Sequence, residues 1–548
     1  MSAPHAGIPE LILLNGNFLT LDRNRPKVKA VAIQDGRIMA VGENDEITAM
    51  AHPSAQTVDL GGRLGLPGMM DSHFHFYDWA LARKQLDLTR VQTLNELLDH
   101  VARTARELPR GRWILGQGWN ESDWPEHTMP RRDQLDKCAP SNPMALWRCD
   151  LHLVSVNSCA LELAGIDETT PDPPDGKIEK DASGRPTGIL RELASNLIKA
   201  IIPEPTADQM AAAMGEGISH LHTLGLTGLH DVRLMGGLEG ASALRAWQVL
   251  NEKGELQMRC WVSLSGESIE EAIALGLRTG LGDDRLRIGH LKFFADGGMG
   301  ARTAWMLEPY LDAEYGMPLG SMDELSRRIG EAEKAGLAVM VHAIGDRANR
   351  EVITILEKLA GSRTGVEERS FELPLLPHRL EHAQMIRIDD IRRLAKLKVA
   401  VCVQPHNMLL DINMIDESVG SRGRWTYAYK EMIDAGIPLI LSSDAPVGDP
   451  SPMLGIHAAV TRQRRDGTPE KGWYPEQRIS VDSAVRGYTT VPAAFYGQNR
   501  EQGTITPGKR ADVIVLDRDI YQVDPMEIAD TRVEMTIFDG RIVFSREK

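Results

Sequence analysis

The feature that most constrains this chain is a run of short apolar segments that alternate with helical patterns between residues 64 and 443. Eight segments have the length and apolar composition of buried strands: 64–75, 227–232, 257–264, 287–295, 337–343, 378–383, 399–404 and 437–443. Segments with apolar residues near helical spacing lie between them: 269–278, 322–335, 347–359, 388–397 and 427–435. This alternation is typical of β/α units around a parallel sheet, and eight units predict an α/β fold with a (β/α)8 TIM-like barrel.

The two ends of the chain predict a second, smaller unit. Short strand patterns occupy residues 8–66, with a turn at Asp35-Gly36, and recur near the C-terminus, with a turn at Asp539-Gly540. Neither end can bury an apolar face alone, so we expect both to form one β-sandwich. The expected division is a sandwich of residues 1–66 and 502–548, a barrel of 67–79 and 206–501, and an insertion of 80–205.

The insertion follows the first barrel strand and is much longer than a usual connection. It is rich in Trp, Pro, Arg and Asp. Functional sites of (β/α)8 barrels lie at the carboxyl ends of the strands, where this insertion leaves the barrel. We therefore expect it to form a lid or a wall of the substrate pocket.

Composition excludes several classes of protein. The 548 residues are 42% hydrophobic and 25% charged, as in soluble globular proteins and unlike disordered or fibrous chains. The 62 Lys and Arg residues against 77 Asp and Glu residues give a net charge of −15. This charge opposes contact with polyanions, so nucleic acid is not an expected partner.

Cysteine usage and the N-terminal segment predict the compartment. The five cysteines form no CxxC pair, and an odd number in a long chain argues for reduced thiols. We find neither a signal-peptide pattern nor an apolar run long enough to span a bilayer. These features predict a cytoplasmic protein without membrane contact, and a homodimer is left open.

The end of the first predicted strand carries a candidate metal site. His73 and His75 are two residues apart, so in an extended segment both imidazoles point to the same side and can share a metal ion. An HxH pair alone is only moderately specific, because a histidine can also be a hydrogen-bonded core residue.

Four further residues of ligand type end later strands of the predicted barrel: Lys292, His342, His382 and Asp444. They converge with His73 and His75 only if the barrel closes. A polar side chain in an apolar strand needs a partner, and one metal ion supplies a partner for several such groups. The whole set in strand order therefore favours a metal centre over separate core histidines.

The same residues carry a family resemblance. Residues 292–304 (KFFADGGMGARTA), 342–348 (HAIGDRA) and 379–384 (RLEHAQ) resemble the amidohydrolase superfamily, in particular its amidohydrolase-3 or YtcJ-like branch, which includes N-substituted formamide deformylases. Further matching features lie at 148–152, 157–158, 186–188 and 503–512, so the resemblance spans nearly the whole chain.

The resemblance implies roles for the ligand set. His73 and His75 would bind the more buried metal, His342 and His382 the second, and Lys292 would be carboxylated on its amine and bridge both. A free ammonium has no lone pair, whereas a carbamate offers two oxygens and a negative charge. The alternative is an unmodified Lys292 paired with an acid such as Asp296 or Asp444, which leaves a mononuclear site.

Asp444 would bind metal and act as the general base that takes a proton from the attacking water and passes it to the leaving nitrogen. The imidazole-rich set favours Zn2+, although the oxygen ligands would also accept Mn2+, Fe2+ or Co2+. One or two ions are compatible with the sequence.

Candidate substrate contacts are spread over the insertion and two loops of the barrel: Trp119, Trp124, Arg148, Asp150, His152, Arg302 and His406. Each has a structural alternative. A tryptophan often packs in a core, and Arg148 and Asp150 can simply pair with each other.

The sequence thus predicts a metal-dependent hydrolase that cleaves a non-peptide carbon–nitrogen bond of a small amide-type substrate, with N-substituted formamides as the first class to consider. A cyclic amide, a carbamate or a deaminated heterocycle is the enzymatic alternative, because fold and ligands do not determine the substrate. A catalytically silent barrel used for binding is the remaining alternative.

Overall fold

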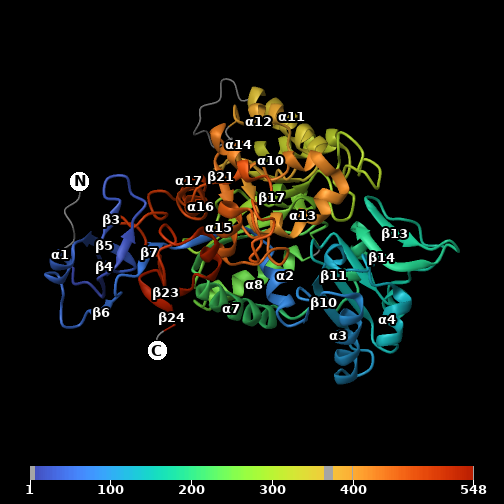
Figure 1. Ribbon diagram of the computed structural model, residues 1–548, viewed down its shortest axis with the longest axis horizontal. Helices are drawn as coiled ribbons and strands as arrows, with labels where there is room; N and C mark the ends of the chain where they lie inside the picture. Colours follow the sequence, from blue (N-terminus) through green and yellow to red (C-terminus); the bar gives the residue numbers. More distant parts are fainter. Residues whose placement is uncertain (1–6, 238, 363–373, 398, 547–548) are drawn as a thin grey trace.

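A barrel of eight parallel strands lies at the centre of the protein, as the computed structural model in Figure 1 shows. The structure describes residues 7–546 apart from 238, 363–373 and 398. In barrel order the strands are β8 (Met69–Phe74), β15 (Leu226–Asp231), β16 (Arg259–Ser265), β17 (Leu286–Phe294), β18 (Val339–Ala343), β19 (Arg379–His382), β20 (Ala400–Val403) and β21 (Leu439–Leu441). Each of the eight predicted strands is present, which confirms the (β/α)8 prediction.

The barrel closes just beyond the carboxyl ends of its first and last strands. The backbone N–H of Asp444 donates to the carbonyl oxygen of His73 at 2.8 Å, and the N–H of His75 donates to that of Ala445 at 2.9 Å. The N–H of Ser443 also donates to the buried Asp71 carboxylate. Closure therefore brings two predicted metal ligands into direct contact through their backbones.

The first predicted strand is divided at Gly68. Residues before it form β7 (Leu64–Pro67), which belongs to a different sheet from β8. A Cβ atom at Gly68 would lie 2.3 Å from Oγ1 of Thr227 on the neighbouring strand, so only glycine fits there. The prediction of one continuous strand over 64–75 was wrong because this close approach was not visible in the sequence.

Helices cover the outside of the barrel, including α7 (Ala207–Thr223), α8 (Gly240–Glu252), α9 (Ile269–Ala274), α10 (Met322–Lys334), α11 (Asp346–Ser362), α12 (Ile388–Leu394), α14 (Tyr429–Asp434) and α16 (Val481–Tyr488). In α10, Leu325, Ile329 and Ala332 recur at helical spacing and are buried, while Ser321 caps the first turn. Within the described ranges, no helix has both the length and the hydropathy needed to cross a membrane.

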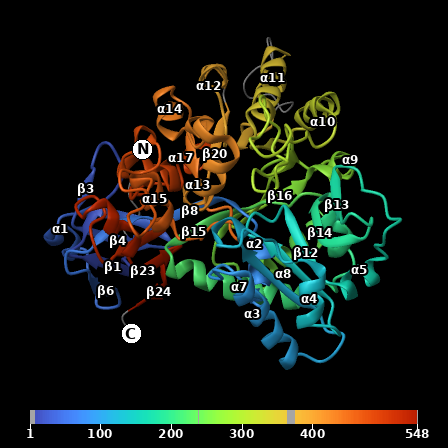
Figure 2. The same ribbon diagram turned by 45° about the vertical axis from the view of Figure 1, so that its right-hand side comes forward.

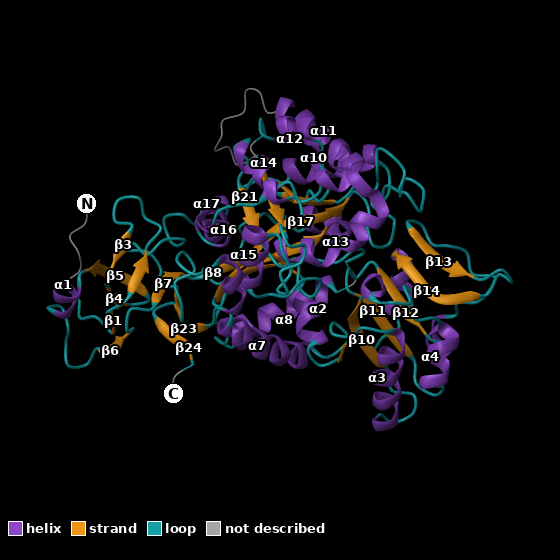
Figure 3. Ribbon diagram, viewed as in Figure 1, coloured by secondary structure: helices purple, strands orange, loops and turns teal. Residues whose placement is uncertain are grey.

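Both chain ends form the two packed sheets on the left of Figure 3. One sheet has the order β5 (Arg37–Gly42), β4 (Ala30–Gln34), β1 (Leu11–Leu14), β6 (Gln56–Asp59). The other has the order β24 (Arg541–Ser545), β23 (Val533–Phe538), β22 (Val513–Leu516), β7, β2 (Asn17–Leu19), β3 (Lys27–Val28). Strand β22 pairs antiparallel with β7, so the ends share one core, which confirms the predicted β-sandwich.

The insertion folds around a sheet of its own, to the right of the barrel in Figures 1 and 2. Its strand order is β13 (Gly176–Lys180), β14 (Pro186–Glu192), β12 (Leu153–Val156), β11 (Met144–Arg148), β10 (Ile114–Trp119), β9 (Leu86–Asp87). Helices α3 (Leu94–Glu107), α4 (Arg132–Cys138) and α5 (Ser158–Ala164) accompany it. Separate hydrophobic cores lie on its two faces, so the insertion is a folded unit rather than a long loop.

Candidate metal centre and active site

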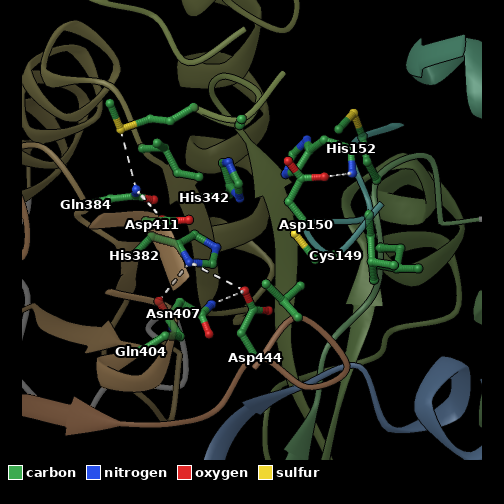
Figure 4. A pocket seen from close by; sticks show the side chains of 18 of the residues that line it. Cys149, Asp150, His152, His342, His382, Gln384, Gln404, Asn407, Asp411 and Asp444 are labelled. Carbon is green, nitrogen blue, oxygen red and sulfur yellow. Dashed lines mark hydrogen bonds and ion pairs between the residues drawn. The ribbon is translucent and has the colours of Figure 1, made fainter. Parts of the chain in front are cut away.

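The predicted ligands come together at the carboxyl ends of the barrel strands. A cavity with about 960 Å³ of empty space, its open mouth included, is lined by His75, Lys292, His342, His382 and Asp444. His73 lies beneath them and is fully buried. Figure 4 shows His382, Gln384 and Gln404 on one side of this cavity and residues of the insertion on the other.

Three of these side chains form a compact group. Oδ1 of Asp444 lies 3.1 Å from Nε2 of His75 and 3.4 Å from Nε2 of His73. Nζ of Lys292 lies 3.5 Å from the same His73 nitrogen. The ligand atoms of His73, His75 and Asp444 all lie within 4.8 Å of one another, a spacing that one metal ion can bridge.

His342 and His382 adjoin this group. Their ring centroids are 4.5 Å apart, and the His382 ring lies 5.0 Å from that of His73. Nδ1 of His382 is 4.0 Å from Oδ2 of Asp444. The six predicted ligands are therefore gathered at one rim of the barrel.

In three of the four predicted imidazole ligands, Nδ1 has a partner of its own, whereas in His342 it is Nε2 that lies 3.4 Å from the carbonyl oxygen of Gly297. Nδ1 of His75 lies 2.9 Å from the carbonyl oxygen of Val232, and Nδ1 of His382 lies 2.9 Å from Oε1 of Gln404. Nδ1 of His73 contacts the Glu381 carboxylate. These partners fix the ring orientations and leave Nε2 of all three rings available for a metal ion.

Glu381 orients His73 and is itself held by Arg379. The guanidinium donates to both carboxylate oxygens at 2.7 and 2.8 Å, and also to the Tyr496 hydroxyl and the Ser72 carbonyl oxygen at 2.6 and 2.9 Å. Burial opposes the charged carboxylate, but Arg379 lowers the pKa of Glu381 below its usual value. The carboxylate therefore remains ionised against His73 in a site without solvent.

Lys292 lies in an environment that disfavours its ammonium. Only 2% of the residue is exposed, and burial lowers its pKa to about 8 although Glu381 and Asp444 act in the opposite direction. Asp296 accepts backbone N–H groups of Trp305, Ile344 and Gly345 at 2.8 to 2.9 Å. Its carboxylate is thus satisfied without Lys292.

Asp444 has an oxygen that the protein itself leaves unsatisfied. Oδ1 is buried and, within the described part of the chain, accepts no hydrogen bond of good geometry. Asn407 donates weakly to the other oxygen at 3.4 Å. Burial acts to raise the pKa of Asp444, but His73, His75 and His382 lower it below its usual range. A charged, buried oxygen among imidazole nitrogens fits a bound cation.

The backbone at this rim is strained. Both Asp444 and His382 adopt positive φ angles, 59° and 68°, which residues with side chains rarely do. Such conformations persist where the surrounding structure enforces them, and they cluster at functional sites.

The insertion contributes the opposite wall through Cys149, Asp150, Leu151 and His152 (Figure 4). Nδ1 of His152 lies 2.7 Å from Oε2 of Glu192, which is almost fully buried. Burial opposes the imidazolium, but Glu192 raises the pKa of His152 to about 9. His152 therefore carries a positive charge at neutral pH, with its ring 5.5 Å from that of His342.

The other candidate substrate contacts lie outside the lining of this cavity. Trp119 and Trp124 are buried in a core of the insertion, and their indole N–H groups donate to the carbonyl oxygens of Leu146 and Val91. They pack in this core and do not line the cavity, which corrects the expectation that these two tryptophans face substrate.

Arg148, Arg302 and His406 are also engaged elsewhere. Arg148 is buried and donates to Glu121 and to Asp150, at 2.8 and 2.7 Å, so it orients the cavity residue Asp150. Arg302 pairs with Asp312 near the surface, and Nδ1 of His406 accepts the backbone N–H of Asp449. None of these three side chains lines this cavity, so their direct contact with substrate stays a prediction.

Several polar residues of the cavity were missed in the sequence. Gln384 and Tyr427 both donate to Oδ2 of Asp411, at 2.9 and 2.5 Å, and Asn407 reaches Asp444. Glu192 was missed too, although it holds His152. Gln384 falls within the RLEHAQ segment; the other positions carry no local pattern that distinguishes them from surface polar residues.

Comparisons with known proteins agree with this geometry. A family model described as the amidohydrolase family matches residues 56–544. The amidohydrolase-family protein YtcJ of Bacillus subtilis (strain 168) is 30% identical over 97% of this chain and 99% of its own. The N-substituted formamide deformylase of Arthrobacter pascens is 29% identical over 98% of both chains.

Among solved structures, an uncharacterized metal-dependent hydrolase from Pyrococcus horikoshii OT3 superposes with a TM-score of 0.74 and 28% identity, covering 94% of this chain and 99% of that one. The match to the family model covers most of the chain, and the fold and the gathered ligand-type residues agree with it. The chain belongs to the amidohydrolase family and is a metal-dependent hydrolase that acts on carbon–nitrogen bonds.

Proposed function

We propose that this enzyme hydrolyses the amide bond of a small N-substituted amide, with N-substituted formamides as the first substrate class to test. The observation that carries the proposal is the unsatisfied, buried Oδ1 of Asp444 between the Nε2 atoms of His73 and His75. The formamide assignment draws further support from the similarity over nearly full length to the deformylase of Arthrobacter pascens.

The residues that would hold a divalent cation are His73, His75, His342, His382, Asp444 and a carboxylated Lys292. Zn2+ is the favoured ion because the set is rich in imidazole. The position of Lys292 supports carboxylation, since its buried amine lies 3.5 Å from Nε2 of His73 and, among the described residues, forms no ion pair with a carboxylate, although Glu381 and Asp444 act on it electrostatically. Its amine nitrogen would bond to the carbon of CO2 and lose a proton, giving a carbamate with two ligand oxygens.

A divalent cation bound here supplies a Lewis acid and lowers the pKa of water towards about 7. The protein provides the proton transfers. Asp444 takes one proton from the attacking water as the new carbon–oxygen bond forms, and it returns that proton to nitrogen as the carbon–nitrogen bond breaks. The products are a carboxylic acid, which is formic acid for a formamide, and an amine.

His152 is placed to stabilise the carbonyl oxygen of the substrate. Glu192 binds Nδ1 and keeps the ring positively charged, so Nε2–H is free to donate. A charged donor in a site largely closed to water favours the transition state, in which negative charge develops on that oxygen.

The test is a hydrolysis screen of the purified full-length enzyme with metal content measured on the same sample. The panel contains N-substituted formamides, longer-chain amides, a cyclic amide and a carbamate. We expect formamide hydrolysis that is lost on chelation and restored by Zn2+. Turnover of only the cyclic amide or the carbamate would overturn the formamide assignment, and turnover that survives complete metal removal would overturn the metal-dependent mechanism.

A further inference from the structure

A second cavity adjoins the metal-centre cavity, and we propose that it binds the N-substituent of the substrate, an aryl or alkyl group that is uncharged or cationic. This inference rests on the proposed amide hydrolysis and names the part of the substrate that gives specificity. We call this second cavity the outer chamber and the metal-centre cavity the inner chamber.

The outer chamber is lined by side chains of helix α2 (Phe76–Ala82) of the barrel and of the sheet of the insertion. It contains about 930 Å³ of empty space, its open mouth included. Tyr77 and Leu81 line it from α2, and Leu115 and Trp147 line it from strands β10 and β11. Aromatic and aliphatic walls of this kind bind the apolar part of a ligand.

The two chambers share part of their walls. Leu151, Lys199 and Leu234 line both, so these three side chains form the partition between them. Leu151 comes from the insertion and Leu234 from the loop after strand β15. A ligand that passes this partition can have its reacting group in the inner chamber and its tail in the outer chamber.

The position of Asp444 indicates which end of the substrate enters the outer chamber. Asp444 lies 3.1 Å from His75, and His75 immediately precedes α2, which carries Tyr77 and Leu81. Because Asp444 returns the proton to the leaving nitrogen in the proposed reaction, that nitrogen has to lie within reach of Asp444 and so close to His75, at the start of α2. Its substituent therefore points towards the outer chamber, whereas the acyl group faces the opposite wall.

The charges that line the outer chamber determine which substituents it prefers. The carboxylates of Asp78, Glu204 and Glu239 line the outer chamber, against the single ammonium of Lys199. Arg233 is buried nearby but is paired with Asp231, so its charge is compensated. The chamber is therefore net negative and disfavours a carboxylate on the substituent while accepting an amine.

The first test compares a short and a long substrate. In the zinc-loaded enzyme, Leu81→Trp and Leu115→Trp each fill the outer chamber, from α2 and from β10 respectively. Each substitution is expected to lower kcat/KM for N-(2-phenylethyl)formamide about 30-fold and to change that for N-methylformamide less than about threefold, since only the long tail is excluded. Leu163→Trp is the matched control, because Leu163 is a leucine of the insertion that is 60% exposed.

Two results would overturn the proposal. Equal losses for both substrates would show that the outer chamber is only an entrance, and unchanged kinetics in both variants would show that the tail lies elsewhere.

The second test compares tails of equal size and different charge. For N-(2-phenylethyl)formamides with a para substituent, kcat/KM should fall in the order aminomethyl, methyl, carboxylate. Asp78→Asn should reduce the ratio of the first to the second by about fivefold, since one of the carboxylates is removed. The reverse order would refute a net-negative chamber.

A binding measurement separates this inference from the proposed function. Calorimetric titration with the product amine 2-phenylethylamine requires no turnover. If wild type binds the amine and Leu81→Trp does not, the chamber is supported even when no formamide is hydrolysed. If both proteins bind the amine equally, the chamber assignment is wrong whichever bond the enzyme cleaves.

Discussion

The two walls of the inner chamber are built differently. On the barrel wall, His73, His75 and His382 come from strand ends, and each has its second ring nitrogen fixed by a buried partner. On the insertion wall, His152 is a mostly buried loop residue whose ring contacts Glu192. The barrel wall is preorganised for a cation, whereas the insertion wall presents the charged ring of His152. We therefore expect metal binding to depend on the barrel wall, and substrate binding and turnover to depend on the insertion wall.

The largest effect should come from Asp444→Asn. The amide keeps the shape of the carboxylate but cannot take a proton, so kcat should fall by about 10³-fold or more. Elemental analysis should still find most of the metal, because the histidine ligands are unchanged. Near-normal turnover would contradict the role of Asp444 as the base.

Lys292→Ala should impair the barrel wall through loss of metal rather than loss of the general base. Without the bridging group we expect at least one metal position to be empty and activity to be lost with it. Metal-to-protein stoichiometry before and after the substitution is the measurement. Unchanged stoichiometry would exclude the bridging model and leave the carbamate without a function.

The pH dependence of kcat/KM tests the role of the insertion wall. The His152 pKa of about 9 lies above its ordinary 6.5, so the imidazolium is fully present below pH 6.5 and is lost as pH rises through 9. We expect kcat/KM to fall on that alkaline side. His152→Gln should lower kcat/KM by about 10²-fold and remove this limb of the profile.

Glu192→Gln provides the matched comparison, because it removes the charge that raises the pKa of His152 and retains the shape of the side chain. The alkaline limb should move to lower pH while metal content stays constant. A limb that does not move in this variant would assign the alkaline limb to another group.

Glu381→Gln should have a smaller effect on the barrel wall. The orientation of His73 is weakened rather than abolished, and loss of such a partner typically costs about 10- to 100-fold in metal affinity or activity. A competition titration with a zinc chelator measures the affinity. Wild-type affinity would show that the Arg379–Glu381 pair does not position His73.

The smallest effect should come from Arg302→Ala. The guanidinium pairs with a half-exposed Asp312 away from the inner chamber, so kcat/KM should change less than about twofold. A change of tenfold or more would show that Arg302 contacts the substrate.

Trp119→Phe tests how the insertion packs. The substitution removes one buried hydrogen bond worth about 1 kcal/mol, so thermal unfolding should show a correspondingly lower stability.

The barrel wall was predictable from the sequence for a physical reason. Strand alternation fixes the side to which a residue points, and parallel strands bring all carboxyl ends to one rim, so His73, Lys292 and His342 could be placed together without knowledge of their contacts. The break at Gly68 could not be placed, because it depends on contact with Thr227 from a distant segment.

The insertion wall was less predictable because no regular pattern in the sequence marks the residues that form it. No periodicity distinguishes a tryptophan that packs, such as Trp119, from one that faces a ligand, and the partnership of His152 with Glu192 joins residues 40 positions apart. The position of the insertion after the first barrel strand predicted a pocket wall, and residues 149–152 line the inner chamber, but which side chains form that wall depends on how the sheet of the insertion packs.

The central claim is most directly tested by crystals of the zinc-loaded enzyme measured at the zinc absorption edge. We expect the strongest anomalous peak at coordination distance, about 2.0–2.1 Å, from Nε2 of both His73 and His75. A peak at any other place, or no peak from protein that contains stoichiometric zinc, would contradict the account.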